Sequence, residues 1–118
     1  MAPLRLEALA VRRGLRGADA EVVRTGMGRA KACTVAETLW LRATKSDCGR
    51  AVAVAGVCGG VEPELRAGDV VVATAVRTED GVERVLPGAA VLANAVRKRG
   101  LRCVTGTILS VGDRKSVV

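Results

Sequence analysis

The sequence has no histidine, phenylalanine or tyrosine, and Trp40 is its one tryptophan. Without histidine to activate a thiol, we do not expect Cys58 to act as a catalytic nucleophile. The four cysteines form no CxxC pair, so we expect neither a metal site nor a cofactor; they are Cys33, Cys48, Cys58 and Cys103. A single aromatic ring also excludes the stacking platforms that bind single-stranded nucleic acid.

Long apolar runs are absent as well. No run approaches the ~20 residues that a membrane-spanning helix needs, so stable membrane insertion is not expected. The opening segment Met1–Glu7 lacks the basic region and apolar core of a signal peptide. Irregularly spaced cysteines are typical of reduced thiols. Together these features predict a cytoplasmic protein.

The charge balance is strongly basic, with a net charge of +7 and a pI near 10.1. Such a balance is found in proteins that bind nucleic acid. Here the basic residues are dispersed, and the longest clusters are only Arg12–Arg13 and Arg97–Arg99. A solvated, arginine-rich face explains this dispersal better, and we expect no nucleic-acid partner.

The 118 residues are enough for one domain with a core of Val, Leu, Ile and Ala. Apolar residues at three- and four-residue steps predict two helices, Pro87 and Gly100 mark the two ends of a third, and continuous β-branched runs predict strands. Expected helices span 4–13, 29–43 and 87–99, and expected strands span 21–25, 51–57, 70–76 and 102–109. This alternation predicts an α/β fold, with a mixed sheet flanked by helices.

A glycine cluster follows the apolar run 51–57, which we expect to be a strand covered on both faces. Gly56, Gly59 and Gly60 let the backbone approach a ligand closely at this strand's exit. Ligands of open α/β sheets sit at the carboxyl ends of strands, so this loop is expected to form a wall of a small-molecule site.

Three patches in this order resemble the nucleoside phosphorylase/nucleosidase superfamily. They are Ala2-Pro-Leu-Arg-Leu-Glu-Ala8, the turn Thr25-Gly-Met-Gly28, and the glycine loop with its following Gly68-Asp69 strand. Within the superfamily, the sequences of these patches are most similar to the branch associated with hopanoid biosynthesis. That branch is thought to remove adenine from adenosylhopane, so the resemblance implies a small-molecule nucleoside substrate.

The resemblance also implies the site residues. Glu7 lies where nucleosidases hold the carboxylate that activates water, a sensible role because cleavage of an N-glycosidic bond forms an oxocarbenium-like sugar. The residues alone favour the alternative that Glu7 is a solvent-exposed charge stabilised by the helix dipole, and the resemblance reverses this preference. Substrate-binding positions are expected at Gly26, Met27, Gly28, Val57, Cys58, Gly59 and Gly60. The turn Gly26–Gly28 otherwise serves simply to join a strand to a helix.

The glycine loop separates two reaction types. In phosphorylases of the superfamily, the corresponding loop has a sequence similar to Arg-Val-Gly-Ser-Cys-Gly. The Arg and the Ser of that loop bind phosphate. This chain has Val54 and Val57 at those two positions, and valine offers a dianion neither charge nor hydrogen bond. Hydrolysis of an adenine nucleoside is therefore expected. The alternatives are phosphorolysis and a non-catalytic nucleoside-binding or assembly module.

The resemblance covers nearly the whole chain but not the whole family domain. We expect residues 1–112 to be the N-terminal portion of a phosphorylase-like domain, and 113–118 to be a tail that is not native to it. The family's acid that protonates the leaving purine has no counterpart here. We expect a homo-oligomer when the protein is full length.

Overall fold

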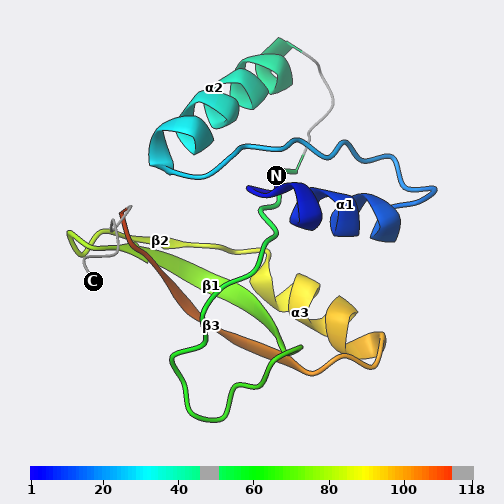
Figure 1. The fold of residues 1–118 in the computed structure, drawn as a ribbon, viewed down its shortest axis with the longest axis vertical. Coiled ribbons are helices and arrows are strands. Elements are labelled where there is room, and N and C mark those ends of the chain that lie inside the picture. The colour runs from blue at the N-terminus through cyan, green and yellow to red at the C-terminus, as the bar shows by residue number, and fades with distance from the viewer. Residues whose placement is uncertain (46–50, 113–118) are drawn as a thin grey trace. The chain divides into compact units, whose positions relative to one another are not determined.

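The computed structural model describes residues 1–45 and 51–112. The chain divides into two compact units, Met1–Cys58 and Gly59–Val118, which are described separately (Figure 1). Cys48 and the expected tail 113–118 lie outside the described residues. The division at Cys58 falls inside the glycine loop.

Two helices form the regular part of the first unit. α1 spans Arg5–Gly14 and α2 spans Arg29–Lys45, which confirms both helices that the apolar spacing predicts. Leu4 has an extended backbone before α1. Arg12 and Arg13 lie in the last turn of α1, where the helix dipole stabilises positive charge. Gly28 accepts the hydrogen bond from Ala32 N at the start of α2.

Three extended segments lie side by side in this unit. Ala2 N donates to the Val23 carbonyl and Thr25 N donates to the Ala2 carbonyl, which is the hydrogen-bond pattern of a parallel bridge. On the other side of the first segment, Met1 N donates to the Ala53 carbonyl and Ala55 N donates to the Met1 carbonyl. The segment that begins with Met1 is therefore central, and its neighbours run parallel to it.

The strands expected at 21–25 and 51–57 are shorter than the sequence predicts. The first is reduced to an isolated bridge at Arg24, and the second is extended without forming a regular strand. The expectation that 51–57 is covered on both faces is wrong, because Val52 is 61% exposed and Val54 is 77% exposed. Among the described residues, only the Met1 backbone gives this segment ladder-type hydrogen bonds, so no sheet buries its valines.

The second unit is a three-stranded sheet with one helix (Figure 1). Its elements are β1 Val70–Thr78, β2 Glu83–Val85, α3 Ala89–Lys98 and β3 Cys103–Ser110. The strand order is β2-β1-β3, with β1 antiparallel to β2 and parallel to β3. The helix lies between the two parallel strands in sequence, as a parallel crossover requires. The mixed sheet with helices confirms the predicted α/β class.

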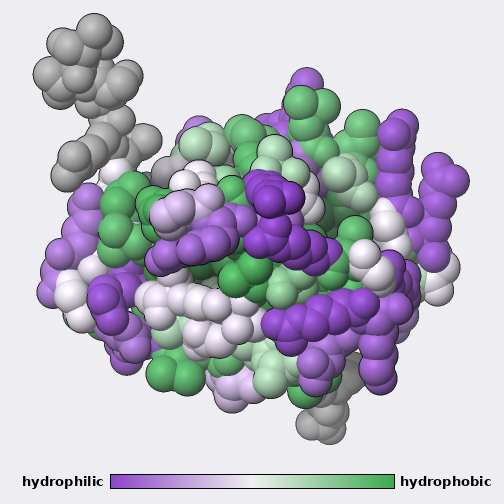
Figure 2. Space-filling model, turned by 90° about the horizontal axis from the view of Figure 1, so that it is seen from below, coloured by the Kyte–Doolittle hydropathy of each residue, from purple (hydrophilic) through white to green (hydrophobic). Residues whose placement is uncertain are grey.

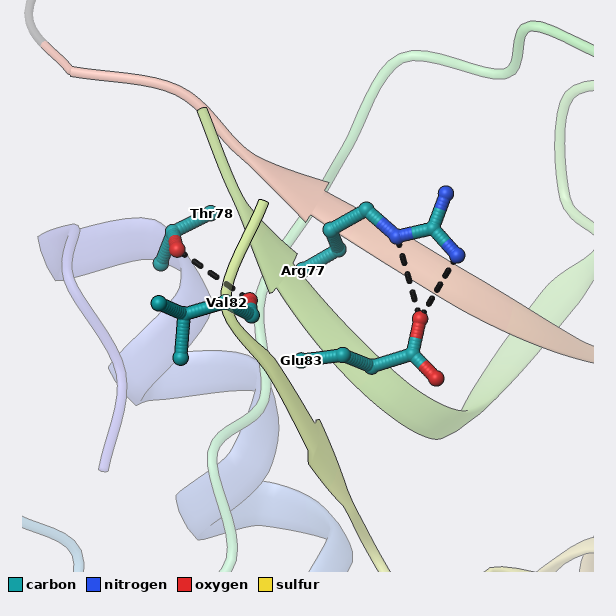
Figure 3. Close-up of polar contacts among 4 residues, drawn as sticks. All are labelled: Arg77, Thr78, Val82 and Glu83. Atoms are coloured by element: carbon teal, nitrogen blue, oxygen red, sulfur yellow. Dashed lines mark hydrogen bonds and ion pairs between the residues drawn. The ribbon is translucent and has the colours of Figure 1, made fainter. Parts of the chain in front are cut away.

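The turn at Glu79–Gly81 is confirmed, and Gly81 has a φ of +84° there. The short strand β2 that follows it was not predicted, because Glu83-Arg84-Val85 has no strand-like apolar pattern. The turn reverses the chain and brings β2 beside β1, with which it pairs antiparallel. Arg77 donates two hydrogen bonds to the Glu83 carboxylate, at 3.0 and 2.7 Å, and the Thr78 hydroxyl donates to the Val82 carbonyl (Figure 3).

The core of the second unit is small. Val72 on β1 packs against Ala89 and Ala93 on α3, with Val70 and Cys103 partly buried beside them. No large side chain among the described residues is fully buried. Figure 2 shows hydrophobic residues interspersed with hydrophilic ones on one face of the molecule. The small core therefore leaves apolar surface exposed, which a larger core would bury.

Candidate functional site

The carboxyl ends of the three parallel segments in the first unit define the candidate site. After Leu4 the central segment enters α1, after Thr25 its neighbour enters the Gly26–Gly28 turn, and after Ala55 the third segment enters the glycine loop. Parallel segments end at the same edge, so these three exits share one edge of the first unit. This is the edge at which open α/β sheets bind their ligands.

Glu7 lies at the centre of this edge, in the first turn of α1, with only 9% of its surface exposed. One carboxylate oxygen, Oε2, accepts a hydrogen bond from Leu4 N at 2.8 Å. The other, Oε1, accepts one from Val57 N at 2.8 Å. Two backbone donors from separate segments therefore fix the plane and position of this carboxylate.

This geometry excludes the alternative that Glu7 is a solvent-exposed helix charge. Its bond to Leu4 N is half of a capping box, in which the third helical residue binds the N-cap amide. Leucine has no side-chain acceptor, so the reciprocal half is missing. The Leu4-x-x-Glu7 spacing indicates the local contact, whereas no sequence pattern indicates the contact with Val57, which lies 50 residues further along the chain.

The Gly26–Gly28 turn needs its glycines. Gly26 has a φ of +77° and Gly28 a φ of +99°, which L side chains rarely adopt. The turn delivers the N-terminus of α2, whose first N–H groups have no partner within the helix and suit anionic or oxygen-bearing ligands. Met27, between the glycines, is 59% exposed. The structure thus presents all three residues at the carboxyl edge.

The glycine loop contributes an apolar surface. Val57 is 82% exposed although its N–H binds Glu7, and Cys58 is exposed with a free thiol. The contact between Val57 N and Oε1 brings the loop to the carboxylate. Gly59 and Gly60 belong to the second unit, where an added side-chain carbon at Gly60 would lie 3.2 Å from the Leu65 side chain.

A metal-binding cluster, a membrane-spanning helix or a groove among the described residues would also bear on function. Residues 1–45 and 51–112 hold no group of three or more His, Cys, Asp or Glu side chains able to bind a metal. No described helix has both the length and the hydropathy to cross a membrane. In the second unit, an open groove of about 510 Å³ is lined by Arg77, Thr78, Glu79, Gly81, Leu109 and Val111.

Comparisons with known proteins identify the family of the chain. The chain is 41% identical over 66 residues to a 5'-methylthioadenosine/S-adenosylhomocysteine nucleosidase from Tolumonas auensis. The match covers 56% of this chain and 27% of that protein, so the chain spans about a quarter of the relative's length. No solved structure gives a significant match. The family profile described as "Phosphorylase superfamily" matches residues 10–114, nearly the whole chain. The chain therefore belongs to the phosphorylase superfamily.

Proposed function

We propose that the whole protein hydrolyses the N-glycosidic bond of an adenine nucleoside and that Glu7 activates the attacking water. The observation that carries this proposal is the buried Glu7 carboxylate, fixed by the N–H groups of Leu4 and Val57 at the carboxyl edge of the parallel segments. A carboxylate held in this way is positioned before the substrate binds, and positioning supplies much of the rate in enzymatic catalysis.

The carboxylate keeps capacity for water despite its two backbone bonds. Each carboxylate oxygen has two lone-pair sites, and each uses only one of them to accept a hydrogen bond from a backbone N–H. A water bound to a remaining site gives its proton to Glu7 as its oxygen bonds to the anomeric carbon. The electrons of the broken bond pass to adenine, which takes up a proton from solvent as it leaves, and Glu7 later returns its proton to solvent. The same negative charge stabilises the oxocarbenium-like sugar.

Water, rather than phosphate, is the nucleophile in this proposal. Val54 and Val57 occupy the two positions at which phosphorylases of the superfamily resemble a loop with a phosphate-binding Arg and Ser. These two valines are 77% and 82% exposed. Exposed valines at these positions leave the loop beside Glu7 without a side chain that binds a dianion. The relative's name, a nucleosidase, supports the same choice.

The substrate that we propose is an adenine nucleoside with an apolar substituent. 5'-Methylthioadenosine and S-adenosylhomocysteine, in the relative's name, are adenine nucleosides substituted at the ribose, and this supports the adenine part. The apolar surface of Val54 and Val57 supports an apolar substituent, and a hopanoid-linked adenosine is our specific candidate.

The test is product analysis with the whole protein. We expect adenine to be released with free sugar as the co-product, at a rate that does not change when inorganic phosphate is added. A substrate pair of adenosine and an adenosine with an apolar 5' substituent tests the specificity, and the apolar substrate should give the higher kcat/KM. Sugar 1-phosphate as the main product would favour phosphorolysis, and tight binding without release of adenine would favour a binding module.

A further inference from the structure

We propose that Gly56 is a positioning residue for Glu7, an inference that rests on the proposed function. Because Gly56 has no side chain, the carboxylate lies directly against the loop backbone and reaches the Val57 N–H. Gly56 thus acts through Glu7 rather than through the substrate. Its role is to admit the carboxylate to the one position where both of its oxygens are bound.

The close approach is measured by what an added side-chain carbon meets. At Gly56, such a carbon would lie 3.0 Å from Glu7 Oε1 and 3.3 Å from Glu7 Cδ. It would also lie 3.4 Å from Pro3 Cδ. A contact of 3.0 Å is shorter than ordinary van der Waals separation, so Glu7 must shift by a few tenths of an ångström beside an alanine.

The requirement at Gly56 is for space and not for backbone conformation. Gly56 is not among the glycines with positive φ in the described chain, so alanine is compatible with its backbone. Gly56→Ala therefore tests the contact with Glu7 alone. Gly14 offers a matched control in the same unit, since it has no positive φ and an added carbon there meets nothing within 4 Å.

The carboxylate has little freedom to yield. Oε2 is held by Leu4 N at the start of α1, so a shift that relieves the clash at Oε1 moves the carboxylate away from Val57 N. Displacing a catalytic group by about 1 Å can cost on the order of 10²-fold in rate, so a shift of a few tenths of an ångström should cost about 3- to 10-fold. We expect Gly56→Ala to lower kcat by about this factor and to leave KM nearly unchanged, since binding of the nucleoside does not use the displaced contact.

The experiment is a double-mutant cycle in the whole protein, with Gly56→Ala and Glu7→Gln made singly and together and Gly14→Ala as control. Two residues that act as one unit give strongly non-additive losses. Gly56→Ala should therefore cost about 3- to 10-fold in kcat in the wild-type background and less than about 2-fold in the Glu7→Gln background. Gly14→Ala should behave as wild type.

Amide hydrogen exchange gives a second readout that does not need turnover. We expect the Val57 amide to exchange faster in Gly56→Ala and to exchange at the wild-type rate in Gly14→Ala, because only the former change displaces its acceptor and weakens the hydrogen bond. Wild-type kcat and unchanged Val57 exchange in Gly56→Ala would overturn the inference. If Glu7→Gln lowers kcat in that case, the proposed function still stands. If Glu7→Gln keeps wild-type kcat, the proposed function itself fails.

Discussion

Replacing Glu7 with glutamine separates the catalytic role of this residue from its structural role. Glutamine has the same shape, and its carbonyl oxygen accepts one of the two backbone hydrogen bonds that Glu7 now accepts. Its amide group faces the other N–H with a donor instead of an acceptor. The substitution therefore removes the base and the charge and costs one of the two backbone contacts.

The expected cost in stability is modest. A hydrogen bond to a charged group contributes about 1.5–3 kcal/mol. Because both contacts are only part-buried, water can replace part of the lost one, so we expect the free energy of unfolding to fall by about 1–2 kcal/mol. A protein with about 5 kcal/mol of stability stays more than about 99% folded after such a loss.

The expected cost in activity is larger. A positioned general base contributes about 10²–10⁴-fold, so kcat of the whole protein should fall by that factor while binding of a nucleoside analogue changes far less. The assay follows adenine release, and urea unfolding measures the stability. Glu37→Gln is the matched control, since Glu37 is an exposed glutamate on α2 in the same unit. Near-normal turnover in Glu7→Gln would refute the reasoning and leave Glu7 as a cap of α1 only.

Two further predictions concern the turn before α2 and the exposed apolar surface. Gly28→Ala should weaken nucleoside binding and lower stability by about 1 kcal/mol, because its φ of +99° is strained for alanine; calorimetric titration and urea unfolding measure both, and unchanged binding would remove the turn from the site. The 118-residue chain should self-associate, since α2 buries no residue and Trp40 is 70% exposed. Light scattering should show Trp40→Lys to be less associated, and a monodisperse wild-type monomer would contradict this prediction.

The sequence predicts the regular elements well and the extended segments poorly. Apolar spacing identifies α1 and α2, and Pro87 with Gly100 identifies α3, because periodicity and helix-end residues are local properties. The run 51–57 looks like a doubly covered strand, yet Val54 is exposed, because burial depends on neighbours that the run itself does not encode. The strand β2 was missed for the opposite reason, since pairing after the Gly81 turn makes a strand of charged residues.

The candidate site shows the same division between local and distant information. Family resemblance indicates Glu7, and the Leu4-x-x-Glu7 spacing is consistent with a helix cap. The contact between Glu7 and Val57 N, and the space that Gly56 leaves for it, appear only when segments 50 residues apart meet at one edge. Periodicity and short motifs do not predict contacts between such distant segments.

The most direct test of the central claim, that water positioned by Glu7 attacks the sugar, is cleavage by the whole protein in ¹⁸O-labelled water with phosphate present. The account predicts that rapidly quenched product is free sugar carrying one labelled oxygen at the anomeric carbon, and that Glu7→Gln forms it far more slowly. Unlabelled sugar 1-phosphate as the product, or labelled sugar formed equally fast by Glu7→Gln, would contradict it.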